Sequence, residues 1–287
     1  MATSPAHKFG QIIGDVLEDA IEPVLKKFSE EHNLYLDKQG PRIARKGLKV
    51  TWTDSKDNKH DLDYVLERGG SEDKIGNPVA FIESAWRRYT KHSRNKAQEI
   101  QGAIVPLTQK YSSNSPFMGV ILAGVFTEGA LQQLKSLGFS ILYFSYEAII
   151  KAFSTVGIDA AFEENTSLAD FNEKLEKWEN LSDEQRALVS KSLFEDNKEK
   201  VVSFIDSLKK SITRSIELVR VFPLHGSSFE YNTLDEAIAF IENYDEKSGS
   251  GSIVRYEVNV RYNNGDEIRA SFQDKETAID FLKNYQS

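Results

Sequence analysis

The stretch PVAFIESAW at residues 78–86 places one acidic side chain inside an otherwise apolar strand pattern. Apolar residues on both sides of Glu83 predict a buried strand, where a carboxylate is costly unless it is paired or bound to a metal. The run that follows, RRYTKHSRNK at residues 87–96, contains five Lys or Arg residues and no acid. A buried acid followed directly by a cationic run indicates a site for an anionic substrate.

The segments before this strand predict a helix and a hairpin. Residues 9–32 repeat apolar side chains at helical spacing, with Pro23 inside the pattern. KGLKVTWT and DLDYVLE flank the polar stretch DSKDNKH, which predicts a hairpin over residues 47–67. Asp63 stands where the second strand of this hairpin becomes apolar.

The segments after the strand alternate helix and strand. Ser93 is expected to cap a helix that runs to Lys110. FMGVILAGVF at residues 117–126 is too continuously apolar for a strand with one face in water, so both faces should be covered. A short helix, the strand FSILYF and the helix YEAIIKAF follow. Residues 1–157 are therefore expected to form an α/β domain, a mixed sheet with helices on its faces.

The rest of the chain predicts two further parts. Residues 158–215 are mostly charged and helical, which suits a connector or a dimerisation arm. Residues 216–287 contain a repeat, since AIAFIENY at 237–244 matches AIDFLKNY at 278–285. Each copy follows strand-like runs around a turn glycine, Gly226 or Gly265, and DEKSGSGS links the copies. The pattern predicts two ββα units that pack as one small domain.

Composition limits the chemistry. The 287-residue chain has no cysteine, so a metal must sit on oxygen or imidazole ligands. Its net charge of −8 argues against a non-specific nucleic-acid coat, although a local basic cleft remains compatible with it. The chain has no apolar run near the roughly 20 residues of a membrane span and no signal-peptide pattern, so we expect a cytoplasmic protein without a membrane partner. Zinc-type histidine pairs, Walker loops and nucleophile elbows are also absent from the sequence.

Two acids on neighbouring strands suggest metal-dependent phosphodiester hydrolysis. Such hydrolysis uses a divalent cation to activate water and stabilise developing charge, and Mg²⁺ prefers carboxylate oxygens. Asp63 begins one apolar strand and Glu83 lies inside the next. A side chain two positions after Glu83, at Ala85, shares its face of the strand.

This arrangement resembles the PD-(D/E)XK nuclease superfamily, which includes many type II restriction endonucleases. The resemblance covers roughly residues 9–155 and rests on the element order, on HDLDYV, and on IESAWRRYTKHSRNKAQEIQGAI. It implies a restriction-endonuclease-like fold and a homodimer that cuts double-stranded DNA with Mg²⁺, for which Mn²⁺ substitutes. It also implies that Asp63 and Glu83 ligate the metal, with Glu18 of the first helix nearby.

One position departs from the family pattern, because Ala85 stands where the motif lysine is expected. Three interpretations remain open. Lys96 on the following helix could take over the lysine role, with Glu99 three residues further on the same face. The site could instead be degenerate and only bind DNA, or Ala85 could be an engineered inactivating change. The chain is thus expected to be a DNA endonuclease, or alternatively a non-catalytic DNA-binding or interaction protein on a decayed nuclease fold.

Each of these residues also has a plain structural interpretation. Asp63 could simply end a hairpin, Glu83 could lie on an edge strand, and Glu18 could belong to a solvated helix face. A basic run is most often a solvated loop, but this one directly follows the candidate catalytic strand, where DNA phosphates would lie. The residues expected to hold phosphates are Arg87, Arg88, Lys91 and Arg94.

Overall fold

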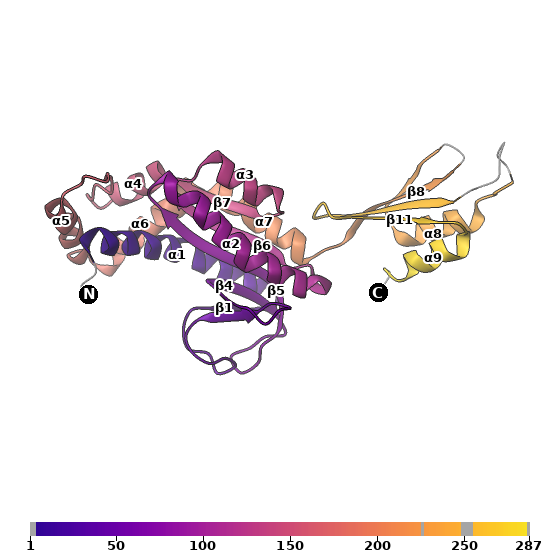
Figure 1. The fold of residues 1–287 in the computed structure, drawn as a ribbon, viewed down its shortest axis with the longest axis horizontal. Coiled ribbons are helices and arrows are strands. Elements are labelled where there is room, and N and C mark those ends of the chain that lie inside the picture. The colour runs from indigo at the N-terminus through magenta and orange to yellow at the C-terminus, as the bar shows by residue number, and fades with distance from the viewer. Residues whose placement is uncertain (1–3, 225–226, 248–254, 286–287) are drawn as a thin grey trace. The chain divides into compact units, whose positions relative to one another are not determined.

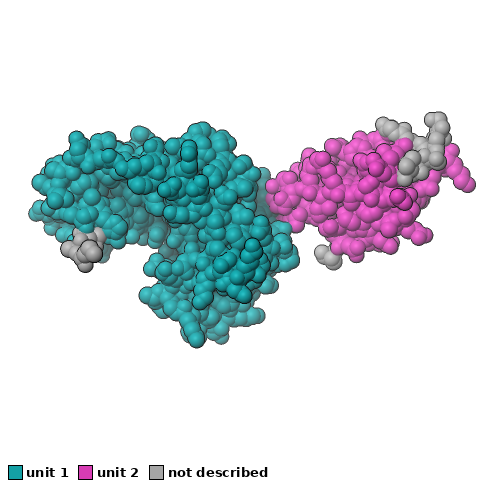
Figure 2. Space-filling model, viewed as in Figure 1, with its two compact units in different colours: residues 1–212 teal, residues 213–287 magenta. Residues whose placement is uncertain are grey.

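The structure, a computed structural model, describes residues 4–224, 227–247 and 255–285. The chain divides into two compact units, residues 1–212 and 213–287 (Figures 1 and 2). It belongs to the mixed α/β class that the sequence predicts, with a helix-flanked mixed sheet in the first unit and a small antiparallel sheet in the second. No helix in the described ranges is both long enough and apolar enough to cross a membrane.

A five-stranded mixed sheet forms the centre of the first unit. In spatial order its strands are β1 (Leu34–Lys38), β4 (Tyr64–Arg68), β5 (Asn77–Arg87), β6 (Phe117–Gly124) and β7 (Ser140–Ser145). The pairs β1–β4 and β4–β5 are antiparallel, whereas β5–β6 and β6–β7 are parallel. The strand with the buried acid, β5, is therefore the central strand of the sheet.

The prediction of one continuous hairpin over residues 47–67 is wrong in its second half. β2 (Val50–Thr53) and β3 (Lys59–Leu62) do pair as a two-stranded ribbon, but the strand pairing of this ribbon ends before Asp63. β4 then enters the main sheet between β5 and β1, a strand that the pattern did not reveal. The physical reason is burial, because the first four residues of β4 are all buried and a place inside the main sheet covers both faces.

Helices cover the two faces of the sheet separately (Figure 1). One apolar cluster joins one face of the sheet to α1 and α4–α7, and the other joins the opposite face to α2 and α3. A short 3-10 turn, Ser112–Asn114, precedes β6. The helices of the first unit are α1 (Pro5–Glu31), α2 (Thr90–Lys110), α3 (Glu128–Ser136), α4 (Tyr146–Ser154), α5 (Leu168–Glu179), α6 (Asp183–Asp196) and α7 (Lys198–Ile212).

The helices expected to form a connector, residues 158–215, pack within the first unit as far as Ile212. Both α5 and α6 contact α1, and α7 contacts β6 and β7. Phe171 of α5 packs against Phe9 of α1, with ring centroids 6.4 Å apart. The apolar side chains of this segment therefore complete the core of the first unit.

The second unit contains the two predicted ββα repeats. Its elements are β8 (Ile216–Pro223), β9 (Phe229–Tyr231), α8 (Leu234–Asn243), β10 (Tyr256–Tyr262), β11 (Glu267–Phe272) and α9 (Lys275–Lys283). The strands form one antiparallel sheet in the order β11-β10-β8-β9, and one apolar cluster joins both repeats. Gly265 has a φ of 90° in the β10–β11 turn, as a turn glycine should. The predicted turn glycine Gly226 and most of the DEKSGSGS linker lie outside the described residues.

Candidate active site

Asp63 and Glu83 lie beside each other on neighbouring strands. In the β4–β5 register Tyr64 pairs with Ile82, so that Asp63, one residue earlier, comes opposite Glu83. The backbone N–H of Ser84 donates a hydrogen bond of 2.7 Å to Asp63 Oδ2. This hydrogen bond holds the Asp63 carboxyl group, which lies between β3 and β4, against the strand that carries Glu83.

The side chain of Glu83 lies on the α2 side of the sheet. Strand alternation gives it the same face as Phe81 and Ala85, and both of these pack in the apolar cluster that contains α2. Glu83 is only 6% exposed. A carboxylate at this depth requires a partner, and α2 provides one.

That partner is Lys96. Its Nζ atom lies 3.6 Å from Glu83 Oε2 and 3.9 Å from Glu99 Oε2, and its side chain is 18% exposed. The helix that carries it begins at Thr90, earlier than expected, and has Tyr89 at its N-cap. The prediction that Ser93 caps this helix is wrong, since its hydroxyl donates to the Thr90 carbonyl from inside the helix, at 2.8 Å.

Burial perturbs both acids. It raises the pKa of Glu83 to about 8; the negative charge of Asp63 adds to this effect, and Lys96 opposes it. Burial also raises the pKa of Asp63, while the Ser84 N–H and Lys96 oppose that rise. Both carboxyl groups therefore hold a proton more tightly than exposed ones do, and a cation bound at Glu83 would compete with its proton.

Glu18 lies on α1 and is more loosely associated with this pair. Although the residue as a whole is exposed, partial desolvation of its carboxyl group raises its pKa to about 7, with the charge of Asp63 as the next cause. Within the described part of the chain, no three Asp, Glu, His or Cys side chains are grouped closely enough to hold a metal. Glu18 therefore does not complete a three-ligand set with Asp63 and Glu83. Mg²⁺ is commonly bound by one or two carboxylates, with water and substrate phosphate as the other ligands.

Ala85 has a packing role. It is buried against α2, in the cluster that includes Ala97 and Ile100. A lysine at this position would begin inside an apolar layer and would have to carry its ammonium group out of it. The lysine that stands next to Glu83 comes from α2 instead.

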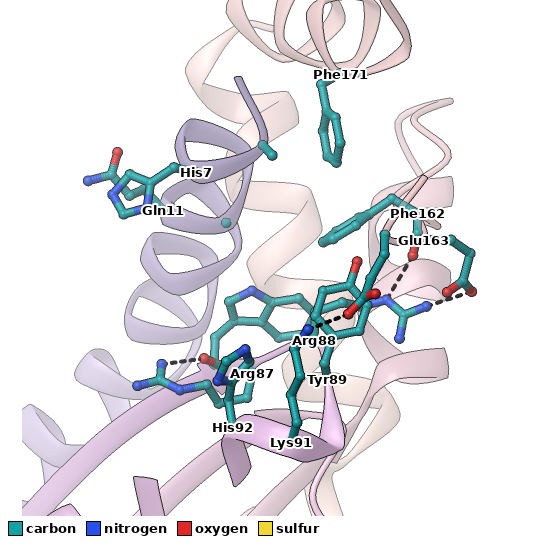
Figure 3. Close-up of a pocket in the computed structure, with 14 residues that line it drawn as sticks. His7, Gln11, Arg87, Arg88, Tyr89, Lys91, His92, Phe162, Glu163 and Phe171 are labelled. Carbon is teal, nitrogen blue, oxygen red and sulfur yellow. Dashed lines mark hydrogen bonds and ion pairs between the residues drawn. The ribbon is translucent and has the colours of Figure 1, made fainter. Parts of the chain in front are cut away.

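The four basic residues expected to hold phosphates differ in their surroundings. Arg88 is 13% exposed; its Nε donates to the Phe162 carbonyl at 2.8 Å and its Nη2 to Glu163 at 2.7 Å (Figure 3). Lys91 Nζ lies 2.6 Å from Glu164 Oε1. By contrast, Arg94 is exposed and pairs with no carboxylate among the described residues. Within the same ranges, the Arg87 guanidinium donates only to the neighbouring Trp86 carbonyl, at 2.7 Å.

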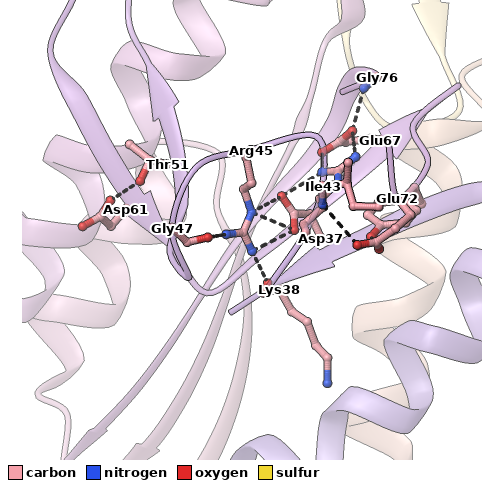
Figure 4. A network of polar contacts seen from close by, with 12 residues as sticks. Asp37, Lys38, Ile43, Arg45, Gly47, Thr51, Asp61, Glu67, Glu72 and Gly76 are labelled. Carbon is pink, nitrogen blue, oxygen red and sulfur yellow. Dashed lines mark hydrogen bonds and ion pairs between the residues drawn. The ribbon is translucent and has the colours of Figure 1, made fainter. Parts of the chain in front are cut away.

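A buried ionic network at the other end of β4 was not anticipated from the sequence (Figure 4). Arg42 Nη1 lies 2.8 Å from Asp37 Oδ2 and 2.6 Å from Glu67 Oε1, and all three side chains are almost fully buried. The guanidinium group also donates to the carbonyls of Ser71 and Lys74. The network fastens two long loops to β1 and β4, and thereby supports the strand that Asp63 precedes.

Asp63, Glu83 and Lys96 form one class of site, in which a buried and a half-buried carboxylate meet a lysine from a neighbouring helix beside a mixed sheet. Comparison with known proteins adds no family to this class, because no family model and no curated protein matches the chain. One solved structure, described as a protein of unknown function (AF1548), is 12% identical and has a TM-score of 0.29. The match covers 69% of this chain and 94% of the other. A likeness this low supports no statement about fold or function.

Proposed function

We propose that this protein is a Mg²⁺-dependent DNA endonuclease that hydrolyses phosphodiester bonds, of the type II restriction kind. The observation that carries the proposal is the convergence of Asp63, Glu83 and Lys96 from three separate elements. Two of these groups are acids whose pKa values are raised by desolvation, which is typical of functional sites. The strand order and the helix-borne lysine are compatible with the PD-(D/E)XK resemblance.

The roles follow from the side-chain chemistry. Asp63 and Glu83 would hold Mg²⁺ or Mn²⁺, which supplies a polarised water and charge stabilisation at the phosphate. Lys96 lies where its ammonium group would offset negative charge that develops in the transition state. Glu99, on the exposed side of Lys96, would orient that lysine.

DNA contact would depend mainly on the cations that are not already engaged. Arg94 and Arg87 suit direct phosphate contact better than Arg88, which is mostly buried and paired. A double-strand cut needs two sites, and a two-fold homodimer would supply them symmetrically. Such an enzyme would act in the cytoplasm, on double-stranded DNA.

Ala85 favours a second candidate, a non-catalytic DNA-binding or interaction protein on a decayed nuclease fold. The two candidates differ in one respect, which is whether DNA is cut when a divalent cation is present. A DNA-binding protein without catalysis also predicts salt-dependent DNA binding, so binding alone does not separate it from a nuclease.

Nicking of supercoiled plasmid in Mg²⁺ or Mn²⁺, with EDTA as the blank, tests the proposal. Asp63→Asn and Glu83→Gln should abolish cutting but keep DNA binding in Ca²⁺. Asp61→Asn is the matched control. Asp61 lies two residues before Asp63, is exposed on β3 and pairs with Lys49. A wild-type protein that binds but never cuts would support the decayed fold. Equal cutting by all variants would mean that the active site lies elsewhere.

A further inference from the structure

A cavity of about 780 Å³ opens at the carboxyl end of β5 (Figure 3). Its walls come from the first turns of α1, the start of α2 and residues 162–171. Glu83 lies four residues before Arg87 on β5, roughly 13 Å along the strand. Trp86 packs with the α1 cluster and Glu83 faces α2, so a DNA strand would pass around the end of β5 to reach both.

The inner wall of this cavity is aromatic. Trp86, Phe162 and Phe171 line it, and the indole N–H of Trp86 makes no hydrogen bond to any described residue. A Cβ added to Gly10 of α1 would lie 3.7 Å from Trp86 Nε1, an ordinary contact distance, so a longer side chain there would extend into the space beside the indole.

The rim of the cavity is polar and carries a small excess of positive charge. Arg88 pairs with Glu163 and Lys91 with Glu164, while Arg87, two histidines and Gln11 complete the rim. The Lys91–Glu164 pair is exposed, at 60% and 64%, so it is worth little and a phosphate could replace the carboxylate. Arg88 is mostly buried and is also held by the Phe162 carbonyl, so it would stay in place as part of the wall.

We propose that this cavity takes one unstacked nucleotide of the DNA strand, with its base among Trp86 and Phe162 and its phosphate on Arg87 and Lys91. The inference rests on the proposed nuclease function. Stacking on aromatic side chains is worth about 1–3 kcal/mol per base, and every base has a face to stack. A free nucleotide offers the same chemistry, so the experiment must separate the two sources.

The test compares two labelled duplexes in Ca²⁺, which supports binding without cleavage. One duplex is fully paired, and the other has an abasic site opposite one central nucleotide, which lowers the cost of extruding that nucleotide. Wild-type protein should bind the abasic-opposed duplex roughly tenfold tighter, a difference of about 1.4 kcal/mol. Gly10→Leu, which fills the space beside Trp86, should lose this preference.

Gly14→Leu is the matched control, because it adds the same side chain to the same helix where nothing lies within 4 Å. Equal preferences in the two leucine variants would overturn the proposal. If Gly10→Leu fails to fold, the ¹⁹F resonance of fluorotryptophan at Trp86 provides a second measurement in otherwise unaltered protein. That resonance should shift with the abasic-opposed duplex and not with the paired one, and an equal response to both would also refute the idea.

Deoxynucleoside monophosphates form the last arm. Tight binding of these without any preference for the opened duplex would show a free-nucleotide site and overturn the strand proposal. The plasmid assay reads the nuclease function separately. If the protein never cuts but prefers the opened duplex, the nuclease proposal is refuted and the nucleotide pocket is kept. If it cuts but shows no such preference, only the pocket proposal is refuted.

Discussion

Replacing Glu83 by Gln keeps the size of a side chain that is only 6% exposed and removes its titration. Burial raises the pKa of this carboxyl group to about 8 from an ordinary 4.5. Between these two values the folded protein holds a proton that the unfolded chain has lost, so the free energy of unfolding falls as pH rises. One pKa unit corresponds to 1.36 kcal/mol, so a shift from 4.5 to about 8 makes the full loss on the order of 5 kcal/mol above pH 8.

Urea denaturation of wild-type and Glu83→Gln protein at pH 5.5 and pH 9 measures this loss. Other groups titrate in both proteins, so the change in their stability difference isolates Glu83. The variant should gain several kcal/mol relative to wild type between the two pH values. Glu99→Gln is the control, since Glu99 is exposed beside the same lysine and should show no such gain. A stability gap that stays constant with pH would refute the assignment of a protonated, buried Glu83.

The same carboxyl group links stability to metal binding. A cation needs the ionised form, so its binding should release protons and strengthen as pH rises towards 8. Without DNA, Mg²⁺ or Mn²⁺ should therefore raise the melting temperature of the wild type more at pH 8.5 than at pH 6. Glu83→Gln should lose most of that increase. An equal increase in the variant would place the cation elsewhere.

Three further predictions concern other side chains of the first unit. Lys96→Ala should lower the cleavage rate by about 10²-fold with little change in DNA affinity. Ala85→Lys should lower the melting temperature and leave the rate no higher, because it buries an ammonium group under α2. Activation by Ala85→Lys would contradict this expectation. Arg94→Ala should reduce the slope of the log affinity for DNA against log salt concentration by about 0.9. Arg88→Met should mainly lower stability in urea. The opposite pattern would reverse the roles given to these two arginines. Arg42→Met should cost about 3–5 kcal/mol in a denaturation experiment, because it leaves Asp37 and Glu67 buried without their cation; a loss under 1 kcal/mol would show that the network relaxes.

Local sequence patterns predicted the central part of the fold. The apolar run around Glu83 became the central strand, and the continuous run at residues 117–126 became β6, covered on both faces. The repeated AIAFIENY and AIDFLKNY segments became α8 and α9 of one domain. These features depend on periodicity and burial within a short window, and such information is present in the sequence itself.

The features that were missed depend on contacts between distant segments. β1 is a five-residue edge strand whose pairing with β4 nothing in the sequence indicates. The partner of Arg88, Glu163, lies 75 residues away. Asp63 and Glu83 could be placed together because adjacent strands define a register. By contrast, the role of Arg88 depends on where a loop returns to the sheet. The proximity of Lys96 to Glu83 was expected from the chemistry of the site and agrees with the structure.

The packing of α1 against α5 and α6 has a consequence for biosynthesis. α1 ends at Glu31 and α6 begins at Asp183, so roughly 150 residues are added before the later partner exists. At a synthesis rate of about 5–20 residues per second, one apolar side of α1 stays uncovered by α6 for on the order of 10–30 s. The nascent chain therefore displays Phe9, Ile13 and their neighbours for a time that suits chaperone binding. The candidate cutting residues are synthesised well within this interval, but the framework that holds them in place is completed only when α7 leaves the ribosome.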